Sequence, residues 1–208
     1  MIKARHSKFF QSLFGLYLSA AFRRHFQSME VIGEVEDKGL PLLIIANHMS
    51  WWDGFWILEL NKKLFRRRFH VMMLEEQLRQ NLFLSRLGAF SIRKRSKSAS
   101  TSIAYAASLL QDPANLLLIF PQGQIQSQHH HEFSFEQGWG RILNQQDKHP
   151  LQIIFVANLL DWGSKQKPIL RQYIASPPAR QGFTCDDLEQ QYNSFFNDCL
   201  SRQKQWLS

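Results

Sequence analysis

Residues 40–53 read LPLLIIANHMSWWD, and this stretch decides the fold. Its first seven positions, Leu40–Ala46, are all apolar and lack the alternation of a strand with one solvated face. A strand that is apolar on both faces is typical of a parallel sheet covered by helices on its two sides. The residues from Asn47 onward mark the loop that follows the strand. The stretch therefore predicts a buried strand of an α/β domain.

Similar runs of strand length recur along the chain and alternate with helical patterns. The other predicted strands are Phe69–Leu74, Ala89–Ile92, Asn115–Phe120, Leu151–Ala157 and Ile169–Ala175. The predicted helices are Gly54–Phe65, Glu75–Leu84, Ser98–Leu110, Gln137–Asn144 and a final helix that begins near Asp186 and runs towards Trp206. This alternation predicts one α/β domain with a mostly parallel or mixed central sheet flanked by helices. In such sheets the functional residues lie just beyond the strand ends.

Charge and aromatic content indicate the kind of partner. The 208 residues fit one domain and carry 25 Lys and Arg against 17 Asp and Glu, a net charge of +8. Such a balance favours anionic partners, which include phosphate-bearing metabolites, an acidic membrane leaflet and nucleic acid. No nucleic-acid-binding motif accompanies the charge, so nucleic acid is not expected. The 17 Phe and 6 Trp indicate a surface that meets something apolar.

The N-terminal segment predicts an amphipathic helix. Phe9–Phe22 is apolar but has only 14 residues, whereas a membrane span needs about 20. An apolar stripe at helical spacing is formed by Phe10, Leu13, Phe14, Tyr17, Leu18 and Ala21, and basic residues bracket the segment. We expect residues 1–29 to form a helix in the lipid headgroup region, ahead of a catalytic domain over residues 30–208. The alternative is a helix packed on its own domain. The chain is expected to lie on a membrane without crossing it.

His48 follows directly after the buried strand. A histidine is the side chain best suited to accept a proton near neutral pH, and a carboxylate that orients it makes it a better base. Asp53 stands five residues on, which on a continuous helix puts the two side chains roughly 140° apart. Their contact requires a turn between them, which Ser50 can supply as helix N-cap. Alternatively, Ser50–Asp53 is only an S-x-x-D capping box.

Two further segments follow predicted strands. Leu118–Gln124 runs from a strand into Pro121-Gln122-Gly123, a turn that can hold an oxyanion or a phosphate, or can simply end the strand. Residues 93–97 carry four cations in five positions, which suit a phosphate or form an ordinary solvated surface. The run of histidines at 129–131 lacks the spacing of a metal site, and no metal or cofactor is expected.

Taken together, these segments resemble the glycerolipid acyltransferase superfamily, typified by 1-acylglycerol-3-phosphate acyltransferases. Asn47-His48-x4-Asp53 matches the NHxxxxD block of that family. Residues 88–93 resemble the G-x-x-F-I-x-R block, with the arginine one place early and Lys94 at the expected position. Residues 120–127 resemble the F-P-E-G-T-R-S block, residues 135–138 the Phe-x-x-Gly after it, and residues 150–156 the last, Pro-containing block.

The resemblance implies an O-acyltransferase on the cytoplasmic face of a membrane, peripheral or monotopic, with membrane lipids as partners. His48 is expected to deprotonate an acceptor hydroxyl, which then attacks the thioester of acyl-CoA or of acyl carrier protein, while Asp53 orients His48. Backbone N–H groups near residues 120–123 are expected to stabilise the oxyanion. The expected substrate-binding residues are Asn47, Arg93, Lys94, Arg95, Phe120, Pro121, Gln122, Gly123 and Gln124.

Two departures from the family pattern concern the acceptor. Gln122 stands where the family has glutamate, and Gln124-Ile125-Gln126 carries no charge where the family has an arginine. These changes remove groups associated with glycerol phosphate binding. Both a lysophospholipid and a non-phosphorylated glycosylated or hydroxylated lipid therefore stay open as acceptors. The rival functions are a non-catalytic binder of anionic lipid and a thioesterase-like hydrolase.

Overall fold

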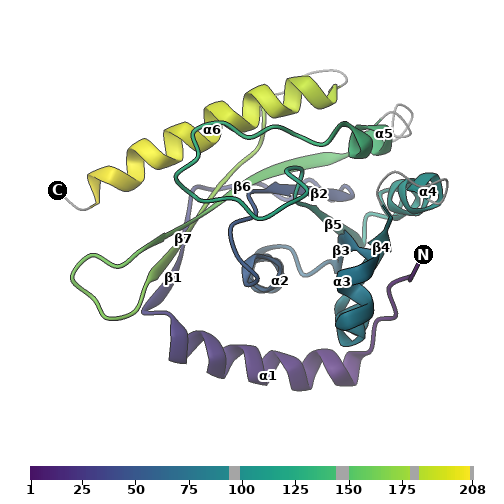
Figure 1. Ribbon diagram of the computed structural model, residues 1–208, viewed down its shortest axis with the longest axis horizontal. Helices are drawn as coiled ribbons and strands as arrows, with labels where there is room; N and C mark the ends of the chain where they lie inside the picture. Colours follow the sequence, from purple (N-terminus) through teal and green to yellow (C-terminus); the bar gives the residue numbers. More distant parts are fainter. Residues whose placement is uncertain (94–98, 144–149, 179–182, 207–208) are drawn as a thin grey trace.

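The computed structural model describes residues 1–93, 99–143, 150–178 and 183–206. Its centre is one seven-stranded sheet with the strand order β1-β7-β6-β2-β5-β3-β4 (Figure 1). The strands are β1 Ser28–Ile32, β2 Leu42–Ala46, β3 Arg68–Leu74, β4 Ala89–Ile92, β5 Asn115–Ile119, β6 Gln152–Asp161 and β7 Ile169–Ala175. All neighbours pair in parallel except β6 and β7, which are antiparallel. The predicted mostly parallel α/β sheet is confirmed.

Helices cover both faces of this sheet (Figure 1). On one side lie α1 Lys8–His25, α2 Asp53–Leu64, the short α3 Glu75–Gln80 and the 3-10 segment η1 Leu82–Leu87. On the other side lie α4 Ala99–Leu109, the 3-10 turn η2 Gln137–Trp139, α5 Gly140–Leu143 and α6 Cys185–Gln205. The sheet therefore has two buried faces, which explains the unbroken apolar character of its inner strands.

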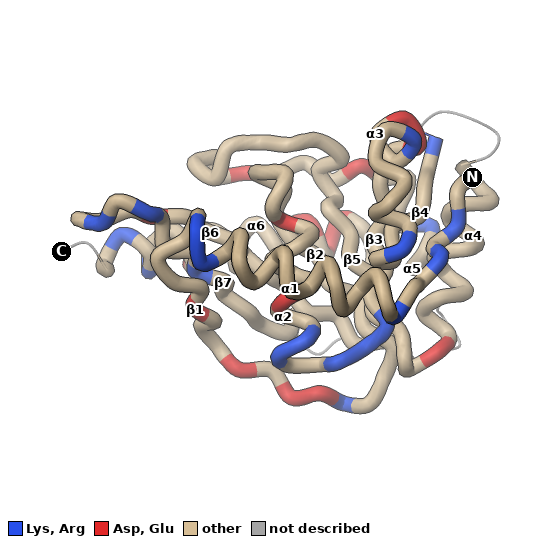
Figure 2. Tube along the Cα trace, turned by 90° about the horizontal axis from the view of Figure 1, so that it is seen from below, with Lys and Arg blue, Asp and Glu red and all other residues tan. Residues whose placement is uncertain are grey.

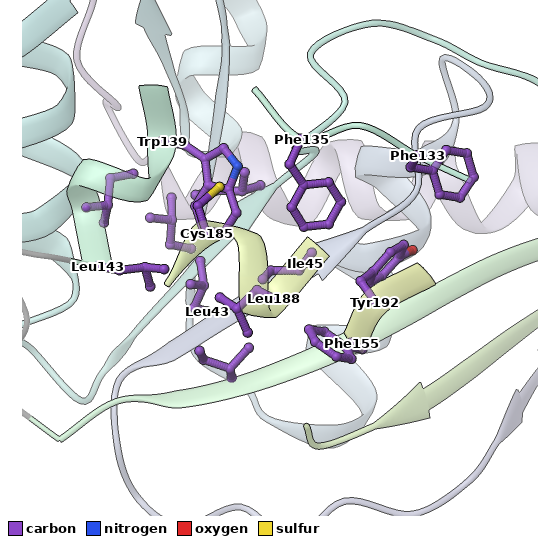
Figure 3. Close-up of a cluster of buried hydrophobic side chains, with 14 of the residues drawn as sticks. Leu43, Ile45, Phe133, Phe135, Trp139, Leu143, Phe155, Cys185, Leu188 and Tyr192 are labelled. Carbon is purple, nitrogen blue, oxygen red and sulfur yellow. The ribbon is translucent and has the colours of Figure 1, made fainter. Parts of the chain in front are cut away.

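β2 shows how one strand serves two cores. Leu43 and Ile45 pack into the core under α4 and α6, together with Phe155, Leu188 and Tyr192 (Figure 3). Its alternate residues, including Leu42, Ile44 and Ala46, pack on the other face with residues of α2. All five residues of the strand are fully buried. The pleat sends successive side chains to opposite faces, so every position must be apolar.

Most predicted elements appear where the apolar pattern places them, but several bounds differ. The helix expected over residues 1–29 spans only Lys8–His25, and the strand expected over Leu151–Ala157 continues to Asp161. The sequence pattern did not predict β1, because this edge strand is only half buried and pairs with β7 alone. The helix expected over 75–84 ends at Gln80, and the chain continues as η1 after a break at Asn81, whose φ is −132°. The helix expected over 137–144 is split into η2 and α5.

Gly88 sets the direction in which β4 leaves η1. Its φ is +115°, a value that favours glycine, and a Cβ at this position would overlap the carbonyl oxygen of Phe69 on β3. No other residue fits without moving β3 or β4. The glycine of the second sequence block is therefore required by backbone packing next to the site.

Candidate active site

The candidate active site lies at the carboxyl end of β2, between β5 and β6. The chain leaves β2 through Asn47, whose side chain is buried and bonds to β6 at two points. Its Nδ2 donates to the carbonyl oxygen of Asn158 at 2.9 Å, and its Oδ1 accepts from the Asn158 N–H at 2.7 Å. Asn47 does not line the cavity described below. Its place in the structure is that of a tether for the loop, whereas the sequence analysis placed it among the substrate-binding residues.

His48 and Asp53 are in direct contact. His48 Nδ1 lies 2.7 Å from Asp53 Oδ2, and the Asp53 side chain is fully buried while that of His48 is 25% exposed. The contact exists because α2 begins only at Asp53, so residues 48–52 form a turn that bends the histidine back towards the helix start. The required turn is therefore present, but Ser50 is not the helix N-cap. That position is Trp52, which has no side-chain cap bond, and Ser50 Oγ accepts from the Trp52 N–H at 3.0 Å.

The Asp53 carboxylate also accepts hydrogen bonds from the turn itself. Its Oδ2 accepts from the N–H groups of Met49 at 2.7 Å and Ser50 at 2.9 Å, and its Oδ1 accepts from Ser50 Oγ at 3.2 Å. Its position at the N-terminus of α2 further stabilises its negative charge. One carboxylate thus satisfies turn donors and orients His48, but Ser50–Asp53 is not a capping box, because α2 has Trp52 as its N-cap.

His48 also lines a cavity. With Nδ1 carrying the proton donated to Asp53, Nε2 keeps a lone pair and can act as a base. The ring stacks on Phe120 with the centroids 4.4 Å apart and an interplanar angle of 16°. The contact with the Asp53 carboxylate and the stacking on Phe120 together restrict rotation of the imidazole ring.

The turn after β5 holds the backbone of His48 on both sides. Gln122 is buried, and its Oε1 accepts from the His48 N–H at 2.6 Å, while its Nε2 donates to Gln126 Oε1 at 2.7 Å. In return, the Gln126 N–H donates to the His48 carbonyl oxygen at 2.8 Å. Gly123 supports this turn with a φ of +66°. The NHxxxxD loop and the FPQG turn are therefore one hydrogen-bonded unit, although 74 residues separate His48 from Gln122.

A cavity of about 740 Å³ opens beside His48 at the ends of β3, β4 and β5. Its size lies within the usual range for small-molecule sites. The lining is mostly apolar and includes Phe55, Leu58, Val71, Met73, Leu84, Ile103 and Trp139. Such a wall is suited to a hydrocarbon chain that starts near the histidine.

Four of the predicted binding residues join His48 in this lining, namely Phe120, Pro121, Gly123 and Gln124. Arg93 does not line the cavity. Its Nη2 bonds to Glu75 Oε1 at 2.9 Å, and the side chain is 57% exposed. Lys94 and Arg95 lie outside the described residues.

Glu75 is a buried carboxylate that the sequence analysis missed. Arg79 Nη2 bonds to it at 2.8 Å from the same helix, and Arg93 approaches it from β4. The hydrogen bond from Arg79, supported by that from Arg93, lowers the pKa of Glu75 to about 2. The carboxylate is therefore ionised at neutral pH and fixes the two guanidinium groups near the ends of β3 and β4. Its position directly after an apolar strand is the only sequence signal that marks it.

Helix α1 has one packed side and one exposed side. Leu18 and Phe22 are buried against α2, whereas Phe9, Leu13, Leu16 and Tyr17 are 56–80% exposed. In Figure 2 the helix crosses the view as a stretch free of charge between basic ends. None of the helices in the described residues combines the length and apolarity of a membrane span.

Comparisons with known proteins agree with this geometry. Residues 25–160 match the family model described as Acyltransferase. A crystal structure of the 1-acyl-sn-glycerophosphate (LPA) acyltransferase PlsC from Thermotoga maritima has the same fold, with a TM-score of 0.53 and 16% sequence identity. The similarity covers 89% of this chain and 76% of that one. A comparison with curated proteins finds no match.

Proposed function

Since the chain belongs to the acyltransferase family and is an acyltransferase, we propose that it moves a fatty acyl group from acyl-CoA or acyl carrier protein to a hydroxyl of a lipid acceptor. The observation that carries this proposal is the 2.7 Å contact between His48 Nδ1 and Asp53, together with the largely apolar cavity that His48 lines. One group is placed to move a proton, and the space beside it is suited to an acyl chain.

The reaction follows from the position of His48. Its Nε2 takes the proton of the acceptor hydroxyl as the oxygen attacks the thioester carbonyl carbon. The new C–O bond forms, the C–S bond breaks, and the imidazolium returns the proton to the leaving thiolate. Asp53 is the orienting group, because it holds Nδ1–H and balances the positive charge that His48 acquires. Neither step requires a covalent enzyme intermediate.

The oxyanion that forms during attack needs a hydrogen-bond donor near the FPQG turn. Pro121 has no N–H group, and the Gly123 N–H already donates to the Phe120 carbonyl oxygen at 3.1 Å. The Gln122 N–H lies between these two residues in the same turn. We assign it to the oxyanion, because it belongs to the turn that is bonded to His48.

The acyl chain is proposed to occupy the apolar cavity. Each methylene group moved from water into such a wall contributes about 0.8 kcal/mol, so a long chain binds far better than a short one. The acceptor is a lysophospholipid or a hydroxylated lipid without phosphate. Among the described residues, the lining around His48 offers amide groups from Gln77, Gln80, Asn81 and Gln124, which suit the hydroxyl groups of the second kind of acceptor.

The proposed location is the cytoplasmic face of a membrane, with the exposed side of α1 against the lipid. The exposed Phe9, Leu13, Leu16 and Tyr17 supply the apolar contact, and the basic ends of the helix suit anionic headgroups. Trp51, which is 56% exposed, also lines the cavity, so an exposed aromatic side chain stands at the substrate site.

The test is a His48→Ala variant assayed with labelled acyl-CoA, acyl carrier protein thioesters and total membrane lipid. We expect acyl transfer to fall by roughly 10²–10⁴-fold, the usual contribution of a positioned base. His130→Ala, which changes an exposed loop histidine, serves as the matched control and should retain activity. Unchanged turnover in His48→Ala contradicts the mechanism. Release of free fatty acid without dependence on an acceptor supports the hydrolase instead.

A further inference from the structure

A row of cations follows the β4 edge of the molecule, apart from the catalytic residues. We call it the cationic edge, and it consists of Lys3, Arg5, Lys8, Arg79, Arg86 and Arg93, all of which are exposed. In Figure 2 its blue segments lie on the right, from the start of α1 to the upper ends of α3 and β4. The elements that carry it contain only two acidic residues, Glu75, which is buried, and Glu76.

The edge is built on a segment that is fixed to the domain. The first seven residues run beside β4 and η1, with the Ser91 N–H bonded to the Ile2 carbonyl oxygen at 2.9 Å and the Ser7 N–H bonded to that of Arg86 at 3.2 Å. The segment therefore spans the length of β4 and η1. Its cations are distributed along this length and do not converge on a single point.

Two of these cations, Lys3 and Arg86, are held against aromatic rings. Lys3 Nζ lies 5.5 Å from the ring centroid of Tyr105, and the Arg86 guanidinium lies 5.6 Å from that of Phe10. Aromatic rings position a cation without neutralising it. Arg79 and Arg93 share the single carboxylate of Glu75. The result is a positioned positive surface, which attracts a partner of opposite charge.

The cationic edge borders the cavity. Helix α3 carries Arg79 on its exposed side, while Gln77 and Gln80 of the same helix line the cavity. At the end of β4, Ile92 lines the cavity and Arg93 follows it. A partner that docks on this edge can therefore deliver a flexible arm into the cavity towards His48.

We propose that the cationic edge docks an acidic acyl carrier protein that delivers the acyl thioester. This inference rests on the proposed function and selects one of its two donors. Coenzyme A is a small ligand, so its phosphates would contact one compact group of cations. The cations of the cationic edge are instead distributed along β4 and η1. A bilayer in contact with α1 would meet only the end of the cationic edge that lies next to α1. The rest of the edge lies farther from α1, because the N-terminal segment runs from α1 to the level of the sheet (Figure 1).

The first experiment measures direct binding of a purified, phosphopantetheinylated acyl carrier protein by fluorescence anisotropy. The variant Lys3→Glu with Arg5→Glu should weaken binding by about tenfold or more, and added salt should weaken binding to the unmodified chain. The matched control is Lys165→Glu with Lys204→Glu, which reverses two exposed cations at the opposite side of the molecule and should leave binding unchanged. Circular dichroism melting checks that both variants fold.

The second experiment compares donors in the acyl transfer assay. With the carrier-bound donor, the Lys3→Glu, Arg5→Glu variant should raise KM about tenfold at unchanged kcat, and KM for acyl-CoA should stay constant. Equal increases of KM for both donors would assign the edge to the phosphate that the donors share. Weaker binding to phosphatidylglycerol vesicles with intact carrier binding would assign it to the membrane. Either result overturns the proposal, as does equal weakening of carrier binding in the control.

Binding of the carrier protein and acyl transfer are measured separately, and either can fail without the other. Carrier binding needs no turnover, so a protein that transfers no acyl group from any donor contradicts the enzyme mechanism and still tests the docking surface. Active transfer from acyl-CoA, with no binding of the carrier protein, contradicts the docking surface and retains the mechanism.

Discussion

Gln122 is one of the residues at which this chain departs from the family pattern, and its side chain joins the two loops of the site. Its amide uses both ends, accepting from the His48 N–H and donating to Gln126. A glutamate at this position can accept both bonds if Gln126 turns its amide to donate. The replacement of the family's glutamate is therefore compatible with an intact turn, and it removes one negative charge from that turn.

At the residue scale, Gln122→Ala should destabilise the protein by about 1–3 kcal/mol, because it leaves the His48 N–H buried without an acceptor. We expect kcat to fall as well, since the His48 backbone loses one of its two anchors. Gln122→Glu should lower the free energy of unfolding by less than half of the decrease caused by Gln122→Ala. Urea unfolding and acyl transfer assays measure the two effects. His130→Ala, which changes an exposed loop residue outside the cavity lining, is the control, and equal losses in it and in Gln122→Ala would contradict the assigned role.

Helix α1 illustrates how one element meets two environments. Its packed side carries Leu18, which is 1% exposed, and its outer side carries Leu16, which is 72% exposed. The aromatic ring of Phe14 contacts Phe55 of α2, with the centroids 5.6 Å apart. The two uses considered for this segment, packing on the domain and lying in a headgroup layer, are therefore compatible, because they involve different sides.

At the element scale, Leu18→Ala should lower the free energy of unfolding by about 2–5 kcal/mol, as expected for a buried leucine. Leu16→Asp should change it by less than about 0.5 kcal/mol, because the side chain is already exposed. The same Leu16→Asp variant should bind phosphatidylglycerol vesicles more weakly in cosedimentation. Vesicle binding at the level of the unmodified protein would contradict the membrane contact proposed for α1.

A half-buried histidine, His6, and a buried one, His70, connect the N-terminal segment to the sheet. The ring of His6 lies edge-on to that of His70 on β3, with the centroids 4.7 Å apart. The pKa of His70 is lowered to about 4, mainly by burial and in smaller part by nearby His6 and Arg68, while Asn115 and Asp112 oppose the shift. Burial also lowers the pKa of His6. Both histidines are therefore neutral in the folded protein at neutral pH.

At the scale of the whole molecule, this pair should make the fold sensitive to acid. The folded pKa of His70 is below its ordinary value of 6.5, so the unfolded chain binds the proton first as the pH falls. The contribution of neutral His70 to the free energy of unfolding is fully present above pH 6.5 and is lost as the pH falls from 6.5 to about 4. The loss is on the order of 3 kcal/mol from the size of the shift. Urea unfolding at pH 7, 6 and 5 measures it.

His70→Gln is the variant that checks the source of this pH dependence. It should flatten the decline between pH 7 and pH 5, because the buried titrating group is gone. His129→Gln, which changes an exposed loop histidine, should leave the decline as it is. An unchanged slope in His70→Gln would place the acid sensitivity elsewhere in the molecule.

The sheet and the core of the site could be predicted from the sequence because they depend on local patterns. β4 and β7 have the bounds that their apolar runs predict, and β2 is buried along its whole length. The His48–Asp53 contact needed only a turn within five residues, which the spacing allowed. The repeat of apolar residues, the residues that favour turns and the short distance in sequence between two side chains are all local properties. They can therefore be recognised in a single sequence.

The tertiary structure alone decided which distant groups meet. Gln122 bonds to His48 across 74 positions, Asn47 bonds to Asn158 across 111, and Arg93 pairs with Glu75 across 18. The cavity and the cationic edge likewise combine residues from many elements. Hydrogen-bond partners and charge neighbours at such separations follow from how the strands order and how the helices pack. The sequence determined which residues could do chemistry, and folding determined which of them share a site.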